Sequence, residues 1–318
     1  MNRIMVVLVA TMLMASSAIA QTYPSKSIRV IVPFAPGGGT DFIARVAAQQ
    51  MTEAFGQQVI VDNRPGAGGN LGTELGVRAA PDGYTLTMVS SSYSVNPSLY
   101  KLPFDPVNDI TAIIQLSQGA MLLVVHPSLP VKNARELIAL GKAKPGGLVY
   151  ASAGHGSITQ LATELFNDMA GVRMIHVPYK GTGPALTDTI SGQAQVLFGN
   201  VATTMPHIKS GRLKALGVST ARRVDAMPEL PTVAESGLPG YESISCYGLI
   251  APKNLPRSVV DRVNTEVNRI LKTREMTDRL SADGVQAVGG TPEQYLALIR
   301  RDIDTWGRIV RKAGIKAE

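Results

Sequence analysis

The feature that most constrains the fold is the alternation of short, β-branched apolar runs with longer helical patterns along most of the chain. Short runs of this kind predict strands, and the longer patterns predict helices, so their order is that of an α/β protein. In the first block we predict strands over 27–33, 58–62, 84–90, 110–116 and 121–125, with helices over 40–55 and from the glycine-rich 65–69 to residue 80.

The same pattern restarts after residue 125 and predicts a second doubly wound α/β sheet. Asn133 and Ser157 are residues that favour the start of a helix. The predicted helices are 133–143, 157–170 and two near Ala185 and Thr203, and the predicted strands are 148–151, 174–177, 195–198 and 213–218.

Proline and glycine interrupt the chain from Pro228, after which a strand over 247–251 and helices over 258–271 and 274–282 are predicted. The last helix has a clear start signal, because Thr291, Pro292 and Gln294 form a capping box with proline in the first helical position. Its apolar stripe includes Trp306, which we expect in the core. We expect this last segment to pack against the first block.

The N-terminus predicts a signal peptide. Asn2 and Arg3 precede the apolar run 4–15, and Ala18-Ile19-Ala20 fits a cleavage site after Ala20. The run is too short to span a bilayer, although a buried N-terminal helix is the alternative. We therefore expect residues 1–20 to be removed and the protein to work in the periplasm.

Length predicts more than one domain, because removing 20 of the 318 residues leaves 298, above the usual size of a single core. We predict two α/β lobes joined by crossings near 119–125 and 225–247, a geometry that permits closure around a ligand. The predicted boundaries are 21–122 for lobe 1, 123–235 for lobe 2 and 236–318 for the part that returns to lobe 1.

Composition excludes several classes of site. Loss of Arg3 leaves a net charge of +6, but the basic residues are scattered and aromatics make up 5% of the chain, so nucleic-acid binding is not expected. Cys246 is the single cysteine, so no intramolecular disulfide can form. We expect no cofactor and no metal, because metal-ligand spacing is absent among the four histidines, His126, His155, His176 and His207.

Three loops place glycine and hydroxyl residues between a strand and a helix: 34–41, 152–157 and 199–204. Free amides and the positive end of the helix dipole favour an anion there, and the carboxyl ends of strands are where open α/β sheets bind ligands. The loops 90–92 and 180–183 add further donors. Simple tight turns are the alternative interpretation of each loop.

The sequences of these loops do not match the enzyme motifs that they most resemble. Gly37-Gly38-Gly39 lacks the ending of a P-loop, and Gly154-His155-Gly156-Ser157 is not a nucleophile elbow. The hypothesis we favour is therefore a binding protein without catalytic activity. An exported hydrolase or transferase that uses Ser157 and His155 is the second hypothesis, and a structural envelope protein is the third.

Several motifs resemble the Bug family, the extracytoplasmic solute receptors of tripartite tricarboxylate transporters. The resemblance follows nearly the whole chain after residue 20, in order. The motifs that carry it are Pro33-Phe34-Ala35-Pro36-Gly37-Gly38-Gly39-Thr40-Asp41, Val61-Asp62-Asn63-Arg64-Pro65-Gly66-Ala67-Gly68-Gly69-Asn70, Asp82-Gly83-Tyr84-Thr85-Leu86, Val177-Pro178-Tyr179-Lys180-Gly181, Gly211-Arg212-Leu213-Lys214-Ala215-Leu216 and Gly290-Thr291-Pro292-Glu293.

The resemblance implies a type II-like Venus-flytrap fold that closes on a small mono-, di- or tricarboxylate and delivers it to membrane permease subunits. We expect a monomer. Phe34 or Tyr93 would stack on an aromatic acid, and Gln160 stands where many members have histidine. The predicted ligand contacts are Phe34, Ala35, Gly37, Gly38, Thr40 and Asp41 in the first lobe, with Ser91 and Ser92 as added donors, and Ser152, Gly156, Ser157, Thr182, Gly183 and Asn200 in the second.

Overall fold

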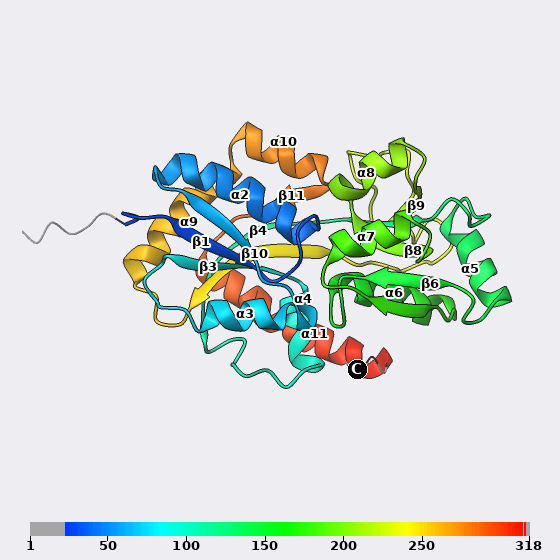
Figure 1. The fold of residues 1–318 in the computed structure, drawn as a ribbon, viewed down its shortest axis with the longest axis horizontal. Coiled ribbons are helices and arrows are strands. Elements are labelled where there is room, and N and C mark those ends of the chain that lie inside the picture. The colour runs from blue at the N-terminus through cyan, green and yellow to red at the C-terminus, as the bar shows by residue number, and fades with distance from the viewer. Residues whose placement is uncertain (1–22, 314, 316–318) are drawn as a thin grey trace, which may run out of the picture.

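Two α/β lobes lie side by side in the computed structural model, which describes residues 23–313 and 315 (Figure 1). The predicted signal peptide lies outside the described residues. Each lobe is built on one sheet, of six and five strands, so the predicted fold class is confirmed.

The first lobe has a mixed sheet of order β11-β4-β10-β3-β1-β2. β1 lies between β2 and β3 and is parallel to both, whereas β10 is antiparallel to β3 and β4. The strands are β1 (Ile28–Val32), β2 (Val59–Asn63), β3 (Thr85–Ser90), β4 (Ile110–Gly119), β10 (Ser245–Pro252) and β11 (Val285–Ala287).

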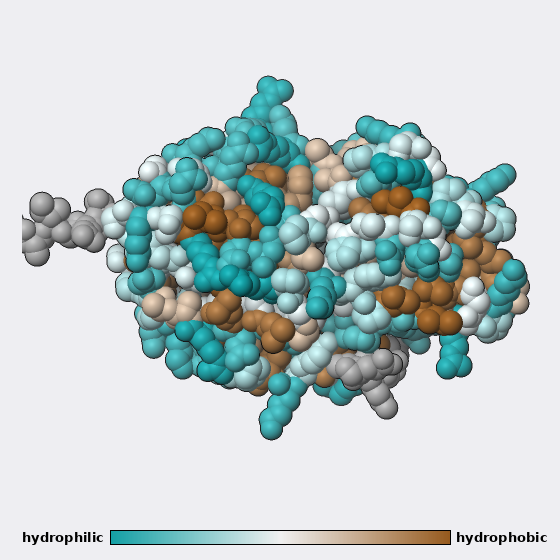
Figure 2. All heavy atoms as spheres, in the orientation of Figure 1, coloured by the Kyte–Doolittle hydropathy of each residue, from teal (hydrophilic) through white to brown (hydrophobic). Residues whose placement is uncertain are grey.

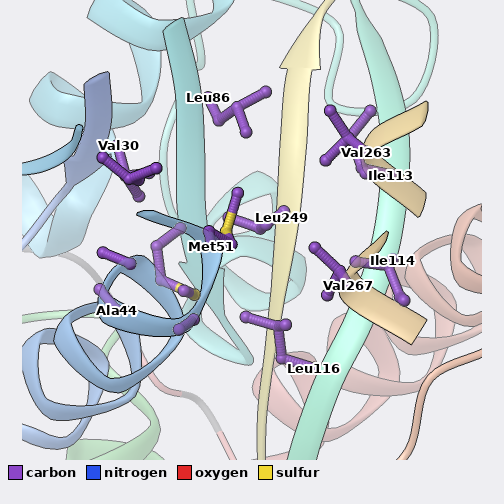
Figure 3. Packing of buried hydrophobic residues seen from close by; sticks show 14 of the residues in the cluster. Val30, Ala44, Met51, Leu86, Ile113, Ile114, Leu116, Leu249, Val263 and Val267 are labelled. Atoms are coloured by element: carbon purple, nitrogen blue, oxygen red, sulfur yellow. The ribbon is translucent and has the colours of Figure 1, made fainter. Parts of the chain in front are cut away.

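Helices cover both faces of this sheet, and side chains alternate between the two layers. Leu249 of β10 packs with Val263 and Met51 on one face (Figure 3). Ile250 packs with Tyr295 on the other face. The helices are α2 (Gly39–Phe55), α3 (Asn70–Val77), α4 (Ser92–Val95), α9 (Arg257–Leu271), α10 (Arg274–Ala282) and α11 (Pro292–Ala313), with short 3₁₀ turns η1 (Ala67–Gly69) and η2 (Asn96–Ser98).

The second lobe has a sheet of order β7-β6-β8-β5-β9. Alternate residues of β5 again enter different layers, since Leu123 packs with α6 residues and Leu122 packs on the α7 side. The elements are β5 (Met121–Val125), α5 (Ala134–Ala143), β6 (Val149–Ser152), α6 (Ile158–Ala170), β7 (Ile175–Pro178), α7 (Thr182–Ile190), β8 (Val196–Asn200), α8 (Val201–Lys209) and β9 (Lys214–Val218).

The lobes are joined at Ala120, between β4 and β5, and by the segment from β9 to β10. A third link is a packing contact. α11 begins against the first-lobe core, where Tyr295 and Ile299 are buried, and ends with Val310 buried in the second-lobe core. In Figure 1 this helix runs along the lower side of the first lobe toward the edge of the second.

The helix starts test the capping predictions individually. The capping box of α11 is confirmed. The backbone N–H of Gln294 donates to Thr291 Oγ1, and the backbone N–H of Thr291 donates to Gln294 Oε1. Ser157 caps α6 as expected. α2 begins at Gly39, one residue before the predicted start at residue 40, and no side chain caps it. β11 has only three residues, too few to show a strand pattern in the sequence.

The surface in Figure 2 is mixed, with hydrophobic areas scattered among polar atoms. One such area lies over α3, where Leu71 and Leu75 are exposed. In the described part of the chain, no helix combines the length and hydropathy needed to cross a membrane.

Candidate functional site

A small cavity of about 20 Å³ lies where the two lobes meet. It is placed by the carboxyl ends of β1, β3, β6 and β8 and by the N-termini of α2, α6 and α7. Its lining residues are Phe34, Gly38, Gly39, Thr40, Ser90, Ser92, Met121, Ala153, Ser157, Ile158, Thr159, Thr182, Asn200, Ser245 and Tyr247.

The N-terminus of α2 contacts the second lobe through one amide. Gly39 N donates to Asn200 Oδ1 over 3.1 Å, and this bond is buried. A Cβ on Gly39 would overlap the Asn200 side chain, so glycine is required for this approach. The approach therefore depends on glycine as well as on the free amide.

Asn200 also donates to the first lobe, because its Nδ2 lies 2.6 Å from the Tyr247 hydroxyl. Burial raises the pKa of Tyr247 well above its usual value, although hydrogen bonds from Ser245 and Asn200 act in the opposite direction. The phenol is therefore neutral and keeps a proton that it can donate. Ser245 is fully buried beside it.

The N-terminus of α6 makes the matching contact in the reverse direction. Ile158 N donates over 3.1 Å to Ser92 Oγ, which belongs to the first lobe. Ser157 Oγ caps the helix by accepting from Gln160 N, and it also bonds Thr159 Oγ1. The ring of His155 is not among the hydrogen-bond partners of Ser157, so the two side chains form no dyad here.

A polar network behind this loop holds it in place. His176 Nε2 lies 2.6 Å from Ser152 Oγ and its Nδ1 lies 3.3 Å from Gln160 Nε2. Gln160 Oε1 accepts from Gly156 N over 2.7 Å. Burial, helped by the nearby His155, lowers the pKa of His176 to about 4, so this ring is neutral near pH 7.

Further direct contacts close the lobes around the cavity. Ala35 N donates to Lys180 O over 2.9 Å, and Tyr100 OH donates to His155 O over 3.0 Å. A Cβ on Gly183 would strike Pro36 O. The cavity is about the size that holds one water molecule, whereas small-molecule sites are usually hundreds of Å³. In this conformation the lobes are closed.

Asp41 lies beside the cavity but supports its wall instead of lining it. Its carboxylate accepts from Gly37 N, from the Arg45 guanidinium and from Asn63 Nδ2. Burial acts to raise the pKa of Asp41, but these bonds outweigh it and hold the pKa below its usual value. The charge is therefore compensated before any ligand arrives.

The cavity lining carries neutral hydroxyl, amide and apolar groups but no Asp, Glu, Lys, Arg or His. Across residues 23–313 and 315 no group of three or more His, Cys, Asp or Glu is placed to hold a metal ion. The arrangement suits an anion held by amides and hydroxyls at helix N-termini.

Comparison with known families shows the family to which the chain belongs. Residues 43–315 match the family described as "Tripartite tricarboxylate transporter family receptor". This chain belongs to that receptor family. The protein BugT of Bordetella pertussis is 35% identical over 322 aligned residues, which cover 99% of each chain.

Solved structures agree with this assignment to the receptor family. A Rhodopseudomonas palustris protein solved with adipate is 33% identical, with a TM-score of 0.90 over 92% of this chain and 99% of its own. MatC of the same species, solved with bound malate, is 31% identical, with a TM-score of 0.86 over 91% of this chain and 100% of its own.

Half of the contacts predicted from the sequence line the cavity of this receptor, and the others support it. Ser91 Oγ accepts a hydrogen bond from Cys246 N, and Ser152 Oγ is hydrogen-bonded to His176 Nε2. The predicted residues in the lining are Phe34, Gly38, Thr40, Ser92, Ser157, Thr182 and Asn200, and those outside it are Ala35, Gly37, Asp41, Ser91, Ser152, Gly156 and Gly183.

Several lining residues were missed by the sequence analysis for identifiable reasons. Met121 and Ser245 belong to the interlobe crossings, which carry no glycine-rich signal. Tyr247 looks like a strand core residue in the sequence. Gly39, Ser90, Ala153, Ile158 and Thr159 sit inside the predicted loops or directly beside them, so proximity in the sequence was the available signal.

Proposed function

We propose that this receptor works in the periplasm, closes its lobes on a small carboxylate, most favourably a dicarboxylate, and delivers it to membrane transporter subunits. The family description supports the transporter partner. The two similar structures with adipate and malate support the ligand class. Export through cleavage after Ala20 remains part of this proposal.

One observation carries the proposal. Two helix N-terminal amides, Gly39 N in the first lobe and Ile158 N in the second, both donate into the cleft to neutral oxygens of the opposite lobe. A carboxylate oxygen is a stronger acceptor than the Asn200 amide or the Ser92 hydroxyl. A ligand carboxylate would therefore displace these oxygens and bind between the two lobes.

The lining also suits the carbon chain of such an acid. Phe34, Met121 and Ile158 supply apolar surface in the lining. Charge-assisted hydrogen bonds contribute roughly 1.5–3 kcal/mol each, and micromolar binding needs about 8 kcal/mol. A few amide and hydroxyl donors are sufficient, so no buried arginine is needed.

Binding requires the lobes to open and close again, because the closed cavity is too small for adipate or malate. Few hydrogen bonds join the two lobes. Most of their acceptors are neutral oxygens, and the Asp283 carboxyl is the exception. The two crossings between the lobes would act as the hinge for this motion. Hydrolase chemistry with Ser157 and His155 is disfavoured, because Ser157 bonds Thr159 and Gln160.

A thermal-shift panel tests the proposal. Aliphatic mono-, di- and tricarboxylates are compared with their neutral amides at equal concentration. Ligand at a hundredfold excess over its Kd stabilises a protein by about 2.7 kcal/mol, so a binding acid raises the Tm and its amide does not. If no acid raises the Tm, or if the amides act equally, the proposed function is wrong.

A further inference from the structure

A buried carboxyl links the two lobes outside the ligand cavity. Asp283 lies between α10 and β11 in the first lobe, and its side chain is 0% exposed. Its Oδ1 accepts a hydrogen bond of 2.6 Å from Ala202 N, the amide of the second residue of α8. Because α8 packs on the second-lobe sheet, this is a bond between lobes.

The second oxygen of this carboxyl has no partner. Asp283 Oδ2 is buried and accepts no hydrogen bond from any described residue. An ionised carboxylate is costly to bury with one donor, even at a helix N-terminus, because the dipole compensates only part of the lost hydration. The environment therefore favours the neutral acid.

Among the described residues no cation forms an ion pair with Asp283. Arg222 and Arg223 line a pocket that also contains Ser281 and Gly284, but Arg223 pairs with Glu235. The charged groups of α10 pair at the surface, as Arg274 with Asp278 and Arg279 with Glu275. α8 carries His207 and Lys209 only in its last turn, β10 brings the neutral Tyr247, and β4 and β11 bring no charged side chain. Burial raises the pKa of Asp283 to about 7, and the Ala202 amide is the one group that lowers it.

Asp283 acts on the ligand site through α8. Asn200 directly precedes this helix and bonds both Gly39 N and Tyr247 OH. Anchoring Ala202 N therefore fixes the Asn200 side chain at the cavity. We propose that Asp283 is a positioning residue of the binding site that takes up a proton when the lobes close and releases it when they open.

The proposal requires that opening breaks this bond, whose two ends belong to different lobes. β11 pairs with β4 in the first sheet, whereas α8 follows β8 in the second. Once in water, Asp283 returns to an ordinary aspartate pKa. Linkage then favours the closed form at acid pH, by about tenfold in the closing equilibrium at pH 6.0 relative to pH 8.5.

This inference rests on the proposed function only for the opening of the cleft, so it is tested without ligand. The radius of gyration is measured by small-angle X-ray scattering at pH 6.0 and 8.5. We expect the wild type to be more compact at pH 6.0. Asp283→Asn keeps an oxygen for Ala202 N but cannot ionise, so it should be equally compact at both pH values.

The matched control is Asp278→Asn, the same substitution at an exposed site on the preceding helix, and it should keep the wild-type pH response. A wild type with the same radius at both pH values overturns the inference, as does a pH response retained by Asp283→Asn. If that variant does not fold, carbon-13 titration of the wild-type Asp283 carboxyl decides: a pKa near 7 supports the inference, and one near 4 overturns it. None of these outcomes bears on whether a carboxylate binds.

Discussion

Asn200 Oδ1, at the end of β8, accepts a hydrogen bond from Gly39 N, the first amide of α2 in the opposite lobe, over 3.1 Å. The bond places a neutral acceptor at a position where the helix dipole favours an anion. It also brings the backbone of one lobe against a side chain of the other. Closure and ligand binding therefore depend on the same pair of residues.

Gly39→Ala should prevent full closure. The new Cβ would overlap Asn200, while the first lobe keeps its fold because alanine is favoured in a helix. We expect ligand affinity, measured by isothermal titration, to fall at least a hundredfold with little change in the ligand-free Tm.

The control for this substitution is Gly56→Ala at the other end of α2, where no atom lies within 4 Å of the new Cβ. It costs about 1 kcal/mol because Gly56 has a left-handed backbone, but it should bind normally. Wild-type affinity in Gly39→Ala would remove the α2 N-terminus from the account.

Tyr247→Phe should weaken binding without unfolding the first lobe. The phenylalanine ring keeps its place in the core, but Asn200 Nδ2 loses its acceptor. A net hydrogen bond contributes roughly 0.5–1.5 kcal/mol, which corresponds to up to about tenfold in Kd. Tyr100→Phe removes an interlobe bond away from the cavity and should change Kd less. Equal effects of the two variants would contradict a specific role for Tyr247.

His176 should make the second lobe sensitive to acid. Burial and His155 lower its folded pKa to about 4, so the unfolded chain binds more protons between pH 6.5 and pH 4. The stability that neutral His176 contributes is present above pH 6.5 and is lost as the pH falls toward 4. The Tm advantage of wild type over His176→Gln should therefore shrink between pH 7 and pH 4.5.

His126→Gln, on a turn of the same lobe, is the control and should leave this pH slope unchanged. Asp283 acts in the opposite direction, because a raised carboxyl pKa makes the fold more stable as the pH falls from 7 toward 4. The two effects oppose each other in the wild type, so each is measured against its own variant. A constant difference between wild type and His176→Gln would contradict this assignment.

Thr291→Ala should destabilise the helix that contacts both lobes. The substitution removes the hydroxyl that accepts from Gln294 N in the capping box of α11. Loss of a cap costs about 1 kcal/mol, which lowers the Tm of a protein of this size by about 2 °C. Differential scanning calorimetry measures the change. An unchanged Tm would mean that the box contributes nothing to stability.

Sequence patterns predicted the fold better than the site. Strands such as 121–125 and the capping box of α11 are local features that the structure confirms. Met121, Ser245 and Tyr247 reach the cavity only because two crossings bring distant segments together, and no local pattern reports that. The family resemblance implies that Asp41 contacts the ligand, whereas in the structure its carboxylate is bonded within the first lobe. Its carboxylate is held at the wall by Arg45, four residues further along α2, and by Asn63 at the end of β2.

The most direct test of the central claim is a crystal structure with the acid that gives the largest thermal shift. We expect its carboxylate oxygens within hydrogen-bond distance of Gly39 N and Ile158 N, with Asn200 Oδ1 and Ser92 Oγ displaced from those amides. An acid bound elsewhere, or one held by a charged side chain while both of these bonds remain intact, would contradict the account.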